Sequence, residues 1–120
     1  MGLFRRSSRR ANDASATAEP SQKEVREATL AHLQEFTRTR VGVEAYVEPQ
    51  TNVTPTTVML VATDGEWTRR RVPDMRAAAA LAQTLGIPVY DVQRTGYPQR
   101  VRDWNARQRI ERRRASSQGS

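Results

Sequence analysis

The segment 57–72 constrains the fold of this chain more than any other part of its sequence. Residues 57–63 (TVMLVAT) are apolar on both faces, which is typical of a central strand. Asp64 and Gly65 follow, and this pair favours a two-residue hairpin turn because both positions of that turn need positive φ. Residues 66–72 then form the return strand. We therefore expect an antiparallel hairpin within a small sheet.

Helix and strand signals precede this hairpin. Residues 21–24 (SQKE) form a capping box, and apolar residues at helical spacing follow it as far as the break at Gly42. Residues 43–48 alternate between apolar and polar side chains, as in a half-buried strand, and Pro49 ends that strand. The first part of the domain is therefore predicted as one helix followed by three strands.

The second part of the domain adds two helices and one strand. Asp74 can cap a helix over 75–85, and Gly86 closes it. Residues 87–92 form a short strand, and a last helix begins after Pro98. The order α-β-β-β-α-β-α predicts an α+β fold, in which a small mixed four-stranded sheet has helices packed on one face.

A two-residue turn also predicts how the hairpin strands pair. The predicted pairs, which share one face of the sheet, are Ala62–Trp67, Leu60–Arg69 and Val58–Arg71. The other face then carries Met59, Val61, Thr68, Arg70 and Val72. If helices cover that other face, Trp67, Arg69 and Arg71 lie on an open sheet surface. An aromatic ring between guanidinium groups can stack on bases and contact phosphates there.

The charge of the chain is concentrated at its two ends. Of the formal net charge of +7, residues 1–20 carry +2 (four Arg against two acidic residues) and residues 98–120 carry +5 (seven Arg against two). Residues 21–97 carry nine side chains of each sign and are neutral. Basic ends attract phosphates through a long-range field. With Lys23 as the only lysine, the arginine content also fits a codon effect of a GC-rich genome.

This charge distribution predicts three segments. We expect a disordered basic tail over 1–20, a single α+β domain over 21–107 and a basic, frayed tail over 108–120. The residues assigned to nucleic-acid binding are Trp67, Arg69, Arg71, Arg107, Arg109, Arg112, Arg113 and Arg114. Two alternatives stay open: Arg69 and Arg71 can pair across strands with Glu44 and Glu48, and the C-terminal arginines can form a solvated tail.

A second group of distinctive side chains follows the second helix. Tyr90, Asp91, Tyr97 and Arg100 lie close together in the sequence and are expected to line a pocket at a strand end. Packing of the last helix explains them equally well. His32, the only histidine, falls at the margin of the first helix's apolar face, where a hydrogen-bonded core or rim residue is expected.

Several classes of site have no support in the sequence. The absence of cysteine excludes disulfides, thiolate metal sites and a cysteine nucleophile, and it suits a reducing cytoplasm. All serines lie at or beyond the ends of the domain, the innermost being Ser21, so a Ser–His–Asp site has no support. The glycines are too scattered for a P-loop or a dinucleotide-binding loop. No apolar run reaches the length of a membrane span. We therefore expect no catalytic residue, no metal and no cofactor.

Two resemblances rest on particular segments. Residues 42–45 (GVEA), 64–71 (DGEWTRRR), 86–92 (GIPVYDV) and 97–100 (YPQR) resemble a family of small, largely uncharacterised actinobacterial proteins. Many of its members are labelled oxidoreductases, so the resemblance implies an oxidoreductase, or an accessory subunit of one, as an alternative function. The order α-β-β-β-α also resembles that of a double-stranded-RNA-binding domain. This chain differs from that domain in having a fourth strand and a third helix.

These observations favour a small, non-catalytic, cytoplasmic binding or adaptor protein. Its basic ends would attract nucleic acid or a nucleic-acid-containing assembly. The alternatives are the oxidoreductase role that the resemblance implies and a protein–protein adaptor whose tails only improve solubility.

Overall fold

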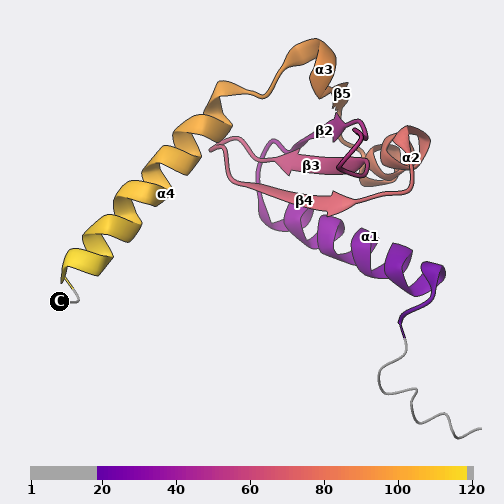
Figure 1. The fold of residues 1–120 in the computed structure, drawn as a ribbon, viewed down its shortest axis with the longest axis horizontal. Coiled ribbons are helices and arrows are strands. Elements are labelled where there is room, and N and C mark those ends of the chain that lie inside the picture. Colours follow the sequence, from indigo (N-terminus) through magenta and orange to yellow (C-terminus); the bar gives the residue numbers. More distant parts are fainter. Residues whose placement is uncertain (1–18, 119–120) are drawn as a thin grey trace, which may run out of the picture.

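The computed structural model describes residues 19–118 and has a mixed α+β architecture (Figure 1). Its elements are α1 (Gln22–Thr39), β2 (Glu44–Glu48), β3 (Thr57–Val61), β4 (Trp67–Arg71), α2 (Met75–Leu85), β5 (Val89–Asp91), α3 (Val92–Thr95) and α4 (Gln99–Gln118). The predicted element order is confirmed, with the four-residue helix α3 added. The predicted N-terminal tail lies outside the described residues, except for Glu19 and Pro20.

The four strands form one mixed sheet in the order β4-β3-β2-β5. The pairs β2–β3 and β3–β4 are antiparallel, and β2–β5 is parallel. The chain therefore crosses from β4, at one edge, to β5, at the other, through α2. Such a crossover is what a parallel pairing requires. The predicted mixed four-stranded sheet is confirmed.

Helices α1 and α2 pack on one face of the sheet. Leu33 of α1 and Leu60 of β3 are fully buried there. Ala78 and Ala82 of α2 are also buried, and their small side chains let the helix approach the strands closely. The buried cluster consists of Leu33, Phe36, Val43, Ala45, Val47, Val58, Leu60, Ala62, Val72, Ala78 and Ala82.

The opposite face carries a smaller cluster, which the beginning of α4 covers. Tyr46, Met59 and Val61 of the sheet pack there with Val101 of α4, and Trp67 lies against them. The prediction placed the helices on one face, so this second contact is an addition to it. This contact has a physical reason. The side chains of β3 are buried on both faces of the sheet, so other elements must pack against both faces.

The register of the hairpin differs by one residue from the predicted one. Val61 pairs with Trp67, and Met59 pairs with Arg69. The N–H of Ala62 donates to the carbonyl of Glu66 (2.8 Å), and Gly65 has φ +94°. This geometry is a three-residue loop with a bulge, so the predicted two-residue turn was wrong. The shift exchanges the faces of β4 relative to β3.

Gly65 brings the hairpin turn into direct contact with α4. A Cβ at this position would lie 2.0 Å from the backbone carbonyl oxygen of Arg100 and 3.0 Å from the Cβ of Trp104. Two arginines bind the turn from the same helix: Arg100 Nε donates to the carbonyl of Ala62 (3.0 Å), and Arg107 Nη2 donates to that of Asp64 (2.7 Å). The hairpin turn therefore anchors the beginning of α4.

Helix α4 continues well beyond its contact with the turn. We expected the ordered domain to end near Arg107 and a frayed tail to follow, but the helix runs to Gln118, and Figure 1 shows it projecting away from the sheet. Only Val101 of this helix is buried. The turns of α4 beyond Arg107, which we call the outer turns, are therefore stabilised by local backbone hydrogen bonds and by the helix propensity of Arg, Gln, Glu and Ala, not by packing.

We predict that Gly65→Ala destabilises the protein far more than Gly86→Ala. Both residues have positive φ, but an added Cβ meets nothing within 4 Å at Gly86. Gly86→Ala, the control, should lower the unfolding free energy by about 1–2 kcal/mol, because only the strain of a left-handed alanine acts there. Gly65→Ala should cost about 3 kcal/mol or more, because strain and overlap with Arg100 combine. Urea unfolding measures both; equal costs would contradict the contact between turn and helix.

Candidate functional site

The sheet face opposite α1 and α2 carries a carboxylate that binds three partners. Glu48, at the end of β2, accepts hydrogen bonds from Arg69 through Nε (2.7 Å) and Nη2 (2.8 Å). It also accepts from the hydroxyl of Thr57 (2.6 Å) and from that of Tyr97. The side chain of Glu48 is only 13% exposed. Paired in this bidentate way, the charge of Arg69 is neutralised within the protein.

A second carboxylate lies at the other end of β2. Glu44 accepts a hydrogen bond from Arg100 Nη2 (2.6 Å) and another from the hydroxyl of Tyr46 (3.0 Å). Tyr97 and Arg100 flank the start of α4, so Glu44 and Glu48 together fix this part of the chain to the sheet. Of the alternative in which Arg69 and Arg71 pair with Glu44 and Glu48, the pair Arg69–Glu48 is present. Glu44 binds Arg100 instead, and Arg71 binds neither carboxylate.

Both carboxyl groups are held in the ionised form. The hydrogen bond from Arg100 is the main reason why the pKa of Glu44 lies below its ordinary value of 4.5. Burial acts to raise the pKa of Glu48, but hydrogen bonds from Arg69, Thr57 and Tyr97 outweigh it and bring that pKa below 4.5 as well. The two groups are therefore structural ion-pair partners at neutral pH.

The four residues predicted to line a pocket have separate roles. The ring of Tyr90 packs against Tyr46, with 5.4 Å between centroids. Asp91 caps α3 by accepting from the N–H of Gln93 (2.8 Å), while Tyr97 and Arg100 bind the two carboxylates of β2. Tyr97 alone of the four lines a depression of about 620 Å³, which it shares with Glu48 and Arg69.

Both tryptophans of the chain line one depression where β4 and α4 come together. The indole Nε1 of Trp67 donates to Asn105 Oδ1 (2.9 Å), and the guanidinium of Arg69 lies 5.0 Å from the centroid of its ring. Trp104 is half-buried and carries Arg107 at 5.7 Å from its ring centroid. A depression of about 450 Å³ here is lined by Trp67, Trp104, Asn105, Gln108, Arg109 and Arg112.

Sequence reasoning identified only part of this depression. It named Trp67, Arg109 and Arg112, but it assigned no function to Trp104 or Asn105. Positions 105, 108, 109 and 112 follow the i, i+3, i+4, i+7 spacing of one helical face, which was the available signal. We call the set of Trp67, Trp104, Asn105, Gln108, Arg109 and Arg112 the tryptophan site.

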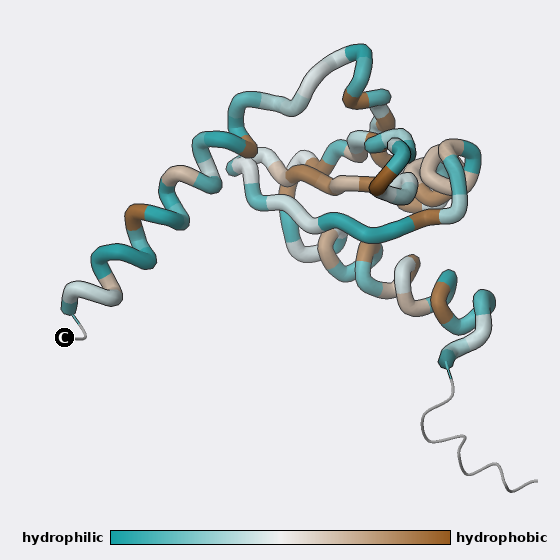
Figure 2. Tube along the Cα trace, in the orientation of Figure 1, coloured by the Kyte–Doolittle hydropathy of each residue, from teal (hydrophilic) through white to brown (hydrophobic). Residues whose placement is uncertain are grey.

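The outer turns of α4 carry cations without counter-charges. Among the described residues, the side chains of Arg109, Arg112, Arg113 and Arg114 have no ion-pair or hydrogen-bond partner, and all four are exposed. Figure 2 shows that α4 is hydrophilic over most of its length. Of the predicted binding arginines, Arg69 and Arg107 are thus bound within the protein. The four arginines of α4 are free to meet an external anion, and Arg71 on β4 is likewise exposed without a side-chain partner among the described residues.

The only histidine has a local structural role. His32 Nε2 lies 2.7 Å from Thr68 Oγ1, between α1 and β4, which confirms a hydrogen-bonded rim residue. Burial lowers the pKa of His32 below its ordinary value of 6.5, and the nearby charges of Arg70 and Arg40 act in the same direction. Within residues 19–118, no group of three or more acidic or histidine side chains is arranged to hold a metal ion.

The comparisons with known proteins add no relative. No family model, curated protein or solved structure matches this chain. In the part of the chain that the structure describes, no helix combines the length and apolar character needed to cross a membrane.

We predict that Glu48→Gln reduces stability by roughly 1–3 kcal/mol at pH 7, because Arg69 and Tyr97 lose their charged acceptor. The folded-state pKa of Glu48 is lowered, so its contribution is present above its ordinary value and is lost as the pH falls through the folded value. The stability difference between wild type and variant should therefore narrow as the pH is lowered from 7 through 4.5 and below.

Urea unfolding across this pH range measures the difference. Glu27→Gln is the matched control, because Glu27 is exposed and has no partner among the described residues. It should leave the unfolding free energy nearly unchanged. A stability difference for Glu48→Gln that stays constant down to acid pH would contradict the assignment.

Proposed function

We propose that this protein binds nucleic acid through α4, without sequence specificity and without catalysis. The observation that carries the proposal is the contrast between its arginines. Arg69 and Arg100 are paired with carboxylates of β2, whereas Arg109 and the run 112–114 project on an exposed helix with no partner among the described residues. Unpaired guanidinium groups at this density favour a polyanion as the ligand.

Arginine on a helix suits phosphate groups for a geometric reason. Its planar guanidinium can donate two parallel hydrogen bonds to phosphate oxygens, which an ammonium group cannot do. An exposed α-helix also has the width that the major groove of duplex DNA admits. Segment 98–120 carries a net charge of +5, while the rest of the domain is neutral. The attraction is therefore directed at one end of the molecule.

The tryptophan site offers a second contact at the base of the helix. Trp104 is half-buried, and Arg109 and Arg112 line the same depression. A base that stacks on an indole ring would place its phosphates within reach of these guanidinium groups, and stacking is tolerant of sequence. A cytoplasmic location belongs to the same proposal, and the absence of cysteine supports it. The actinobacterial and oxidoreductase resemblances stay predictions.

We predict that replacing Arg112, Arg113 and Arg114 together by Gln weakens binding and flattens its salt dependence. Each arginine that neutralises a DNA phosphate contributes about −0.9 to the slope of log affinity against log salt. The slope of the triple variant should therefore be less steep by up to about 3. Fluorescence anisotropy of a labelled DNA duplex and a labelled RNA, between about 50 and 200 mM salt, measures this.

The matched control removes three positive charges elsewhere. Lys23, Arg76 and Arg94 are exposed, lie off α4 and have no partner among the described residues. Their triple Gln variant should keep most of the wild-type affinity. Equal losses in the two triple variants would show a general charge effect and contradict a site on α4. Absence of binding by the wild type would refute the proposed function.

We also predict that a single-stranded oligonucleotide quenches the tryptophan emission on binding. The chain contains two tryptophans, and both lie in the tryptophan site, so the signal reports on that site alone. Trp104→Ala should lower both the quenching and the affinity, the latter by about 1–3 kcal/mol if a base stacks there. Binding seen by anisotropy with unchanged emission would restrict the contact to the outer arginines.

A further inference from the structure

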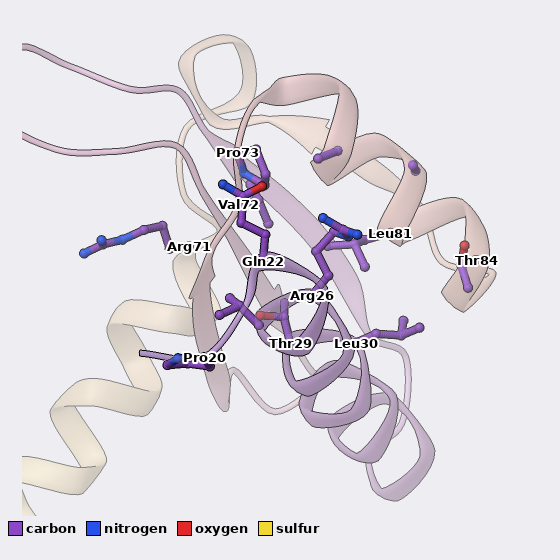
Figure 3. A pocket seen from close by; sticks show the side chains of 13 residues that line it. Pro20, Gln22, Arg26, Thr29, Leu30, Arg71, Val72, Pro73, Leu81 and Thr84 are labelled. Carbon is purple, nitrogen blue, oxygen red and sulfur yellow. The ribbon is translucent and has the colours of Figure 1, made fainter. Parts of the chain in front are cut away.

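An apolar groove of about 560 Å³ lies between α1 and α2 (Figure 3). Val25 and Leu30 of α1 form one wall, and Ala80 and Leu81 of α2 form the other. The groove belongs to the helical side of the sheet, whereas the tryptophan site lies where β4 meets α4. The two sites share no residue.

The groove results from the way α1 leaves the sheet. Leu33 and Phe36, in its C-terminal half, are buried, but residues 22–28 are all exposed and Val25 remains 47% exposed. The facing residues of α2 include Ala80, whose side chain is too small to fill the space between the helices. An apolar stripe on α1 therefore stays uncovered.

All charged side chains that line the groove are positive. Figure 3 shows the side chain of Arg26 reaching from α1 toward Leu81, while Arg71 points away. The side chains of Arg26 and its neighbour Gln22 have no hydrogen bond or ion pair with any described residue. No carboxylate lines the groove. Its chemistry is thus an apolar floor with an unpaired guanidinium and an amide at the rim.

We propose that this groove binds the hydrocarbon chain of a fatty acid, with the carboxylate on Arg26. The volume falls within the range of about 300–1,000 Å³ that small-molecule sites occupy. The guanidinium can donate two hydrogen bonds to the carboxylate, and the Gln22 amide supplies a further donor. The hydrocarbon covers Val25, Leu30 and Leu81 and removes their surface from water. This proposal is independent of nucleic-acid binding.

The test is an NMR titration of the full chain with octanoate, decanoate and dodecanoate. Saturable shifts of the methyl signals of Val25, Leu30 and Leu81 are expected, with affinity rising as the chain lengthens. Octanol serves as the uncharged counterpart of octanoate. Arg26→Gln should weaken octanoate binding roughly five-fold and leave octanol binding unchanged, because it removes an exposed charge pair only.

Two further variants make the result specific. Arg76→Gln, on α2 but outside the groove, should bind octanoate as the wild type does. Ala80→Trp should fill the groove and abolish binding of both octanoate and octanol. Because Ala80 is exposed, circular dichroism should show that this variant folds.

Three outcomes would overturn the proposal. One is a titration without saturable shifts at Val25, Leu30 and Leu81. Another is an Arg26→Gln variant whose affinity for octanoate equals that of the wild type. The third is a dimer in sedimentation experiments that Ala80→Trp disrupts while no carboxylate binds, which would assign the groove to a second copy of the chain.

Discussion

The ion pair between Glu48 and Arg69 is the interaction on which the arrangement of the C-terminal half depends. Glu48 lies on a central strand and is largely buried, so its charge needs donors within the protein. Arg69 supplies two, and Tyr97 supplies another from the segment before α4. The pair thus joins the edge strand β4, the central strand β2 and the entry to α4. Glu44 and Arg100 make a second link between β2 and α4, at the other end of the strand.

This internal pairing also decides which charges face outward. Arg69 and Arg100, which are bound to carboxylates, contribute little to the field around the molecule, because each is neutralised at close range. The arginines of outer α4 have no acidic strand beside them, since the helix has already left the sheet (Figure 1). The same helix is therefore anchored at its beginning by ion pairing and is positively charged at its outer end. That division supports our assignment of nucleic-acid binding to the outer turns.

The two sides of the sheet differ in how completely they are covered. On one side, α1 and α2 bury Leu33 and Phe36, but residues 22–28 of α1 stay exposed and leave the groove that we assign to a fatty acid. On the other side, the first turns of α4 cover Tyr46 and Met59 and leave the tryptophan site beside them. Each proposed site therefore lies where a helix departs from the sheet, because apolar surface stays accessible there.

Local signals in the sequence determined the elements of this fold. The capping box at Ser21 and Glu24 forms as predicted, with both of its hydrogen bonds. Asp74 and Gly86 cap the two ends of α2, also as predicted. These features depend on neighbours within a few residues, which the sequence displays directly. Only the tertiary structure decided the hairpin register and the partners of the β2 carboxylates. Gly65 allows either a two- or a three-residue turn, and partners distant in sequence meet only when the sheet and α4 are assembled.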